Sequence, residues 1–139
     1  MPPVLEHTPM NRTIMVEIAP GELIDKITIL EIKLARIKDA AKLQNVRAEW
    51  ETLTRARDAA IAPSPEIAAA TAALKRANEI LWDVEDQIRD CERTKDFGPR
   101  FVTFARSVYV TNDERARLKR RINELLGSRL IEEKSYASY

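Results

Sequence analysis

Cysteine and histidine are almost absent from this chain, which contains one of each, Cys91 and His7, among its 139 residues. A single cysteine excludes a disulfide bond within the chain. The common zinc sites need several cysteine or histidine ligands, so we expect no metal site and no cofactor. His7 lies in the N-terminal stretch, which argues against catalysis through a buried histidine. Cys91 falls on an apolar helix face and is predicted to be a small core residue.

Glycine is also scarce, with three residues, whereas 45% of the residues are apolar and 32% are charged. This composition favours a helical protein over a turn-rich sheet protein. A chain of this length is expected to form one domain with an ordinary apolar core. We predict a flexible N-terminal arm over residues 1–12 and a single helical domain over residues 13–139.

Long apolar runs are missing as well. No segment reaches the length of a membrane span, and the N-terminus lacks the apolar region of a signal peptide. The sequence therefore predicts a cytoplasmic protein that does not enter the membrane.

The charges are unevenly distributed along the chain. Residues 1–92 contain 12 basic and 16 acidic side chains, whereas residues 93–139 contain 11 and 6. The basic C-terminal part either docks on the acidic helices or meets an anionic ligand. Nucleic-acid binding is disfavoured, because the net charge is only +1 and the basic cluster at residues 115–121 has no groove-reading element or stacking aromatics beside it.

Two long amphipathic helices are predicted in the first two thirds of the chain. Neither proline nor glycine interrupts residues 22–62, and apolar residues recur with the spacing of a coiled-coil seam, so we expect one helix from Glu22 to about Ala60. A second helix starts after Ser64, its predicted cap, and keeps a heptad seam as far as Cys91. The short connection between the helices predicts an antiparallel hairpin.

Two shorter helices are predicted in the C-terminal third. One covers residues 100–109, and the other is opened by a capping box from Thr111 to Glu114 and ended by Gly127. The tail that follows has enough apolar residues to dock. The predicted fold is therefore all-α: a long antiparallel helical hairpin with two shorter C-terminal helices and a docked tail.

A homodimer is expected from two features. Residues 13–18 alternate weakly and are predicted as a short strand or an extended lead-in, which would need the C-terminal tail or a second subunit as its partner. The apolar face of the first helix is also wider than one neighbour can cover.

A polar cleft is predicted at the open end of the hairpin, where the start of the first helix would lie beside the end of the second. The candidate ligand-binding residues are Asp25, Thr28, Glu31, Arg89, Glu92, Arg100, Arg106 and Tyr136. Arginines in such a cleft can bind the carboxylate or phosphate of an anionic small molecule. The alternative is a structural network of ion pairs at the end of a bundle.

Four stretches together resemble a small bacterial family described only as a domain of unknown function. They are residues 19–33 (APGELIDKITILEIK), 81–89 (LWDVEDQIR), 112–116 (NDERA) and 132–136 (EEKSY). The resemblance extends over the chain from about Ile14. It implies a helical protein associated with surface-polysaccharide genes, and it brings no activity or catalytic residue.

The start of the first helix carries a second resemblance. Residues 23–27 (LIDKI), with Arg36 about three turns later, are similar to the first helix of the all-helical chorismate mutases. This similarity implies that Lys26 and Arg36 hold a dianionic substrate and stabilise charge on its ether oxygen. The pattern of that family does not continue beyond this helix.

Two functions remain open at this point. The first is a non-enzymatic binding or interaction module. The second is a small helical enzyme or binder that handles an anionic metabolite. The residues alone do not decide whether the protein is an enzyme.

Overall fold

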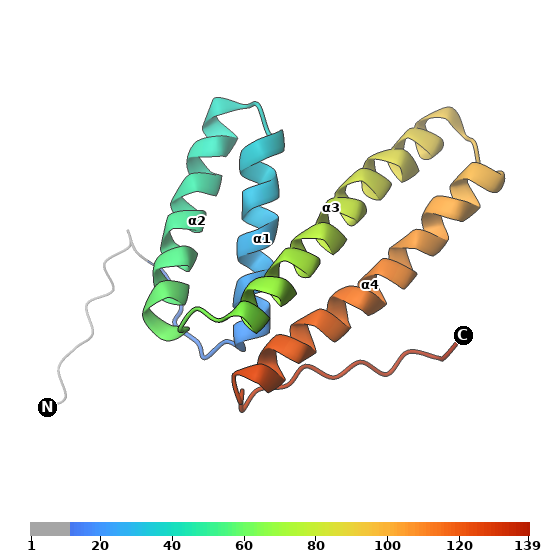
Figure 1. Cartoon of the computed structure of the whole chain (residues 1–139). Coiled ribbons are helices and arrows are strands. Elements are labelled where there is room, and N and C mark those ends of the chain that lie inside the picture. The colour runs from blue at the N-terminus through green and yellow to red at the C-terminus, as the bar shows by residue number, and fades with distance from the viewer. Residues whose placement is uncertain (1–11) are drawn as a thin grey trace, which may run out of the picture.

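A computed structural model of the protein describes residues 12–139 (Figure 1). Within this range it contains four α-helices and no strand: α1 (Pro20–Arg36), α2 (Ala40–Ala60), α3 (Pro65–Thr94) and α4 (Pro99–Leu125). The predicted all-α class is confirmed. The predicted arm lies almost wholly outside the described residues, and residues 13–18 form neither helix nor strand.

Local sequence signals set several helix ends. Pro20 occupies the first turn of α1, where its missing N–H costs nothing. Ser64 caps α3 by accepting a hydrogen bond from the Ile67 amide at 3.2 Å. Gly127, with a φ of 62°, follows the end of α4 in the left-handed region that glycine adopts without strain. Two of these signals, Ser64 and Gly127, were predicted from the sequence.

The single helix predicted from Glu22 to Ala60 is instead two helices. The chain leaves the helical conformation at residues 37–39 and turns back on itself. Asp39 starts α2 by accepting a hydrogen bond from the Lys42 amide at 3.0 Å. The turn allows α2 to lie along α1 and to bury Val46 and Thr54.

The two shorter helices predicted at the C-terminus form one helix, α4. Thr111 and Glu114 lie inside it, so their capping box has no free helix end to cap. A capping signal favours a helix start, but an uninterrupted helix is more stable when the residues before and after the signal both pack against a neighbouring helix. Here α3, with 30 residues, gives α4 a continuous surface to pack against.

The four helices form two antiparallel pairs, α1 with α2 and α3 with α4, and α1 also packs against both helices of the second pair (Figure 1). The hairpin predicted between the first two long helices is replaced by this arrangement. Because α2 returns the chain to the level at which α1 begins, α1 and α3 run in the same general direction (Figure 1). Asp25 therefore meets Asn78 near the middle of α3 rather than the 100–106 region.

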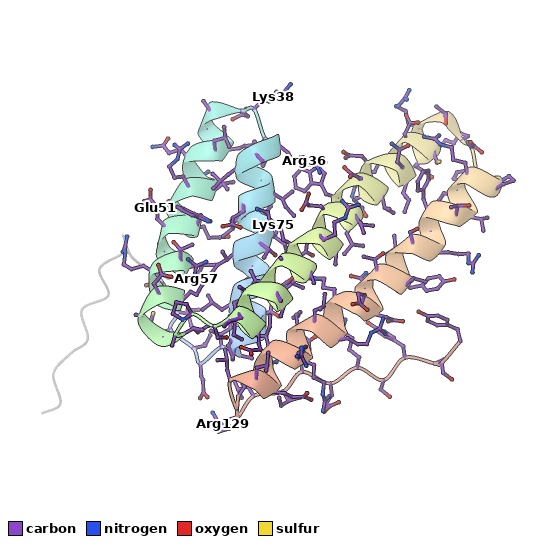
Figure 2. All side chains as sticks on the ribbon, viewed as in Figure 1. Arg36, Lys38, Glu51, Arg57, Lys75 and Arg129 are labelled. Atoms are coloured by element: carbon purple, nitrogen blue, oxygen red, sulfur yellow. The ribbon has the colours of Figure 1, made fainter. Side chains whose placement is uncertain are left out.

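Two ion pairs join the side chains of α1 to those of α3. Arg36 pairs with Asp83 at 2.5 Å, and Lys75 pairs with Glu31 at 3.3 Å. Figure 2 shows Arg36 and Lys75 on the sides of α1 and α3 that face one another. Both pairs are partly exposed, so each contributes little to stability.

The apolar core lies where α1, α3 and α4 meet. Its centre is Ile24, Ile67, Ala70, Leu74 and Ile122. The predicted seam of α3 is buried at six of its eight positions, and Leu81 and Ile88 are half-buried. Cys91 is fully buried, as predicted, and Trp50 and Trp82 are half-buried.

None of the helices within residues 12–139 is long and apolar enough to cross a bilayer.

Candidate functional site

A buried carboxylate, Asp25, organises the contact between α1 and α4. Its side chain is 1% exposed, and Arg115 of α4 binds both of its oxygens, with Nε to Oδ1 at 2.9 Å and Nη2 to Oδ2 at 2.5 Å. Asn78 of α3 donates a third hydrogen bond from Nδ2 to Oδ1 at 2.9 Å. A bidentate arginine and a further donor together compensate the desolvation of the carboxylate.

Two further contacts extend this pair into a polar ladder, which we define as Gly21 with Asn123, Glu22 with Lys119, and Asp25 with Arg115. The Gly21 amide donates to Asn123 Oδ1 at 2.8 Å, and Lys119 Nζ lies 2.6 Å from Glu22 Oε2. Residues 115, 119 and 123 are one helical turn apart, so they lie on one face of α4. Because α1 runs antiparallel to α4, successive turns of α4 meet successively earlier residues of α1.

Gly21 permits the close approach of the two helix backbones at one end of the ladder. A Cβ atom at this position would lie 2.4 Å from the Lys119 carbonyl oxygen and 2.9 Å from Asn123 Oδ1. The nearer of these atoms belongs to the backbone of α4 and cannot rotate away. A larger residue would therefore push α1 away from α4.

Thr28 completes the buried part of the site. Its Oγ1 donates to the Asp25 carbonyl at 2.8 Å and accepts from Asn78 Nδ2 at 3.0 Å. Within the described part of the chain, every buried side-chain nitrogen and oxygen has a hydrogen-bond partner. The interior of the site is therefore a satisfied structural network.

Arg115 also has an outward side. Its side chain is 27% exposed, and no described residue accepts a hydrogen bond from the guanidinium N–H groups that Asp25 leaves free. The hydrogen bond to Asp25 raises the pKa of Arg115, so the group stays cationic. Arg115 lines two cavities, one of about 920 Å³ and one of about 420 Å³.

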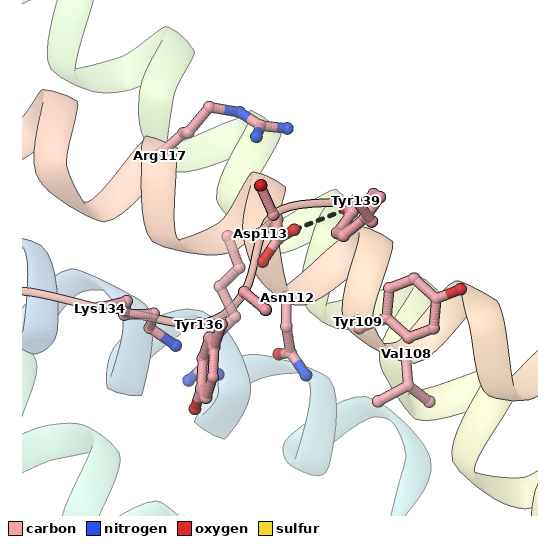
Figure 3. A pocket seen from close by; sticks show the side chains of 11 residues that line it. Val108, Tyr109, Asn112, Asp113, Arg117, Lys134, Tyr136 and Tyr139 are labelled. Carbon is pink, nitrogen blue, oxygen red and sulfur yellow. Dashed lines mark hydrogen bonds between the residues drawn. The ribbon is translucent and has the colours of Figure 1, made fainter.

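The larger cavity, which we call the tail cavity, lies between α4 and the C-terminal tail (Figure 3). Asn112 and Arg115 line it from α4, and Lys134 and Tyr136 line it from the tail. The end of the tail is held by Tyr139, whose hydroxyl donates to Asp113 at 2.6 Å and whose ring meets Tyr109 edge to face. Ion pairs of Lys119 with Glu132 and of Arg120 with Glu133 hold its start.

Positive charge dominates the tail cavity. The ammonium group of Lys134 lies over the Tyr136 ring at 5.8 Å, and no described carboxylate is within 4.0 Å of it. The Asn112 amide has no hydrogen-bond partner among the described residues, and Figure 3 shows it beside the cavity. Asp113, the acidic group of the lining, is occupied by Tyr139. The free donors therefore favour an anion.

The smaller cavity, which we call the helix cleft, lies where α1, α3 and α4 diverge. Its apolar lining is Ile29, Ile32, Leu81, Trp82 and Val108, and its polar lining is Asn78, Glu85, Asp86, Asn112 and Arg115. The two cavities share Val108, Asn112 and Arg115, so they meet at the outward side of the arginine.

The model of a protein family of unknown function, DUF6165, matches residues 14–139. The chain belongs to this family. Membership agrees with the resemblance found in the sequence, and it assigns no activity. No curated protein and no solved structure matches the chain.

The structure brings together only part of the predicted site. Asp25 and Thr28 belong to the buried network, and Tyr136 lines the tail cavity on the other side of Arg115. Glu31 lies apart from them, where it accepts hydrogen bonds from Lys75 and Trp50.

The remaining predicted residues lie at the far end of the α3–α4 pair. Arg89 pairs with Glu85, Glu92 with Lys95, and Arg100 with Asp90. Arg106 is exposed on α4. Lys26 and Arg36, which the similarity to chorismate mutases implied, are exposed as well, and Arg36 is engaged with Asp83.

The sequence prediction missed the residues that line the tail cavity beside Tyr136: Asn112, Arg115 and Lys134. One usable signal was the four-residue spacing of Arg115, Lys119 and Asn123, which places them on one face of α4.

Docking of the basic C-terminal part on acidic positions of α1, one of two alternatives from the charge pattern, is confirmed. Among residues 12–139, no group of three or more histidine, cysteine, aspartate or glutamate side chains is placed to hold a metal ion.

Proposed function

We propose that this protein is a non-enzymatic binding module that holds an anionic small molecule on the outward side of Arg115. The observation that carries this proposal is the double role of the guanidinium group. Asp25 fixes it in place through two hydrogen bonds, and its other N–H donors remain available at the meeting point of two cavities. A guanidinium that is already immobilised loses little conformational entropy when it binds a carboxylate or phosphate.

Two neighbouring groups support an anionic ligand. Asn112 offers an amide donor in both cavities, and Lys134 offers a cation on the tail side. Together with Arg115 they present donors from α4 and from the tail toward one space. Such convergence of a few polar groups in a concave site is typical of small-molecule binding.

The protonation behaviour of the cavity supports binding rather than acid–base catalysis. Hydrogen bonding to Asp25 raises the pKa of Arg115, and hydrogen bonding to Asp113 raises the pKa of Tyr139. Neither group can then exchange a proton readily near neutral pH, as a general acid or base must.

We further propose that the chain forms a homodimer. Ile14, Met15 and Val16 are 85%, 91% and 73% exposed, although they are adjacent large apolar residues. A contiguous exposed apolar segment of this kind favours contact with another surface. The same segment on a second copy of the chain can supply that surface, as in a symmetric dimer.

Titration calorimetry with a panel of mono- and dicarboxylates, inorganic phosphate and sugar phosphates tests the anion site. Lys134→Ala and Asn112→Ala remove cavity donors without touching the buried network. We expect each to weaken binding of the best ligand by about tenfold, which corresponds to one lost charge-assisted contact.

Arg121→Ala is the matched control, because Arg121 is an exposed cation on the same helix. Its affinity should equal that of the wild type. Equal weakening by Arg121→Ala and Lys134→Ala would mean that the protein attracts anions only through its general charge, and absence of binding by every ligand would reject the proposal.

A further inference from the structure

We infer that the ligand of this site is an amphiphilic monocarboxylate, with a compact apolar group joined closely to its carboxylate. This inference rests on the proposed anion site and adds the helix cleft to it. The carboxylate would lie on Arg115 and Asn112, and the apolar group would enter the cleft. The shared lining of the two cavities is the juxtaposition that carries this inference.

The helix cleft has apolar walls on all three helices. Ile29 and Ile32 come from α1, Leu81 and Trp82 from α3, and Val108 from α4. A volume of about 420 Å³ is near the lower end of the range for small-molecule sites. The cleft therefore suits a single ring or a short branched chain rather than a long lipid.

The cleft exists because of the way the helices cross. α1 and α3 touch where Asp25 meets Asn78, and they diverge from that point toward the loop after α1 (Figure 1). Arg36 reaches across the opening to Asp83 (Figure 2). Trp82 and Ile29 lie between these two contacts and are half-buried, so their apolar surface is available to a ligand.

Two acidic residues determine the orientation of the ligand. Asp86, which forms no ion pair with a described residue, and Glu85, whose charge is partly compensated by Arg89, also line the cleft and disfavour a negative charge inside it. The carboxylate is therefore excluded from the apolar end and directed to the edge that Arg115 and Asn112 share with the tail cavity.

The same electrostatics favour a single negative charge. Arg115 and Asp25 together are neutral, so the uncompensated cation beside the site is Lys134. A monoanion balances this one charge, whereas a dianion would bring excess negative charge toward Glu85 and Asp86.

Calorimetry with four related probes tests the inference: acetate, phenylacetate, 2-phenylethanol and 2-phenylethylamine. Phenylacetate carries both the charge and the ring, and each other probe lacks one of them or reverses the charge. We expect phenylacetate to bind at least about tenfold more tightly than each of the other probes, because burial of the ring adds to the contact with Arg115.

Fluorescence locates the bound ring. In a Trp50→Phe background the remaining tryptophan emission comes from Trp82, since the chain has two tryptophans. Phenylacetate should change this emission, and acetate should not. Ile29→Ala should remove most of the advantage of phenylacetate over acetate. Leu43→Ala, which changes a half-buried apolar residue of α2 outside the cleft lining, should leave that advantage intact.

The outcomes separate the inference from the proposed function. If a small polar anion of the earlier panel binds and phenylacetate gains nothing over acetate, the amphiphilic ligand is rejected and the anion site stands. Equal binding of 2-phenylethanol, or tighter binding of 2-phenylethylamine, also overturns the inference, since the cleft would then select apolarity alone or a cation. Absence of binding by all anions in both experiments rejects the site and the inference together.

Discussion

Arg115 binds both carboxylate oxygens of Asp25, a residue 90 positions earlier in the chain, and thereby joins α4 to α1. The inner donors of the guanidinium serve the fold, and its outer donors face the two cavities. Substitution of Arg115 itself would therefore affect folding and binding together. Tests of the two roles need separate residues.

The folding role is tested by Asp25→Ala. This change leaves the half-buried Arg115 without its partner and removes the acceptor of the Asn78 amide, so we expect the free energy of unfolding to fall by about 3–5 kcal/mol. Urea unfolding followed by circular dichroism measures it. Asp83→Ala is the control, because its ion pair with Arg36 is exposed, and it should change stability little. Equal effects of the two substitutions would contradict the central role of the buried pair.

Gly21→Ala tests the close contact at the end of the polar ladder. Alanine is the better helix former by about 1 kcal/mol, so propensity alone predicts stabilisation. The new methyl group would instead meet the Lys119 carbonyl, and we expect a net loss of about 1–3 kcal/mol, typical of overpacking. Gly98→Ala is the comparison for crowding, since its new methyl group would lie an ordinary 3.4 Å from the Asp96 side chain. Gly98 is the N-cap of α4, so this change should cost only the smaller free energy of replacing a glycine cap by alanine. The midpoint temperature of thermal unfolding should fall more for Gly21→Ala than for Gly98→Ala.

Periodicity in the sequence predicted the all-α class and most of the buried seam of α3. It failed at the turn after α1, where residues 37–39 contain neither glycine nor proline and Asp39 alone marks a new start. This single turn reverses the direction of the next element. It makes α1 and α3 codirectional, which moves Asp25 away from Arg89 and Arg100 and toward Asn78.

The prediction missed Arg115, the central residue of the candidate site, for a related reason. Arg115 reaches Asp25 only because α4 continues through the capping box at Thr111, and that continuity depends on packing against α3. Local signals favoured a helix start at this place, and the tertiary contact overrode them. The tail contact between Tyr139 and Asp113 joins residues 26 positions apart and has no local signature at all.

Tyr139→Phe tests the docking of the tail. The substitution removes the hydrogen bond to Asp113 and keeps the ring against Tyr109. We expect faster amide exchange over residues 134–139 and weaker binding of anions, with unchanged global stability. Tyr136→Phe is the control, because no described residue hydrogen-bonds its hydroxyl, and it should leave exchange unaltered. Equal exchange rates in wild type and Tyr139→Phe would show that the hydroxyl does not hold the tail.

The same contact predicts a pH dependence. The hydrogen bond to Asp113 raises the pKa of Tyr139, so the docked tail favours the protonated phenol. Stabilisation of the docked state is therefore complete below the ordinary phenol pKa of about 10 and is lost as the pH rises through the raised value. Ultraviolet titration should show one tyrosine ionising later than the others, and this late transition should be absent in Tyr139→Phe. Loss of tail protection below the ordinary phenol pKa would contradict the assignment.

Self-association is tested through the exposed segment before α1. Ile14→Glu combined with Val16→Glu places two charges among adjacent apolar residues that are 85% and 73% exposed in one chain. Because two copies of this segment would meet across a twofold axis, each charge would face its own symmetry mate or a close neighbour, and repulsion would add to the lost apolar contact. We expect the wild type to sediment as a dimer at micromolar concentration and the double variant as a monomer with an unchanged circular dichroism spectrum. Ala68→Glu with Ala72→Glu is the control, since both alanines are exposed on α3 and the added charge is the same. A wild type that remains monomeric throughout this range rejects the dimer, and a dimer that survives Ile14→Glu with Val16→Glu places its interface on another surface.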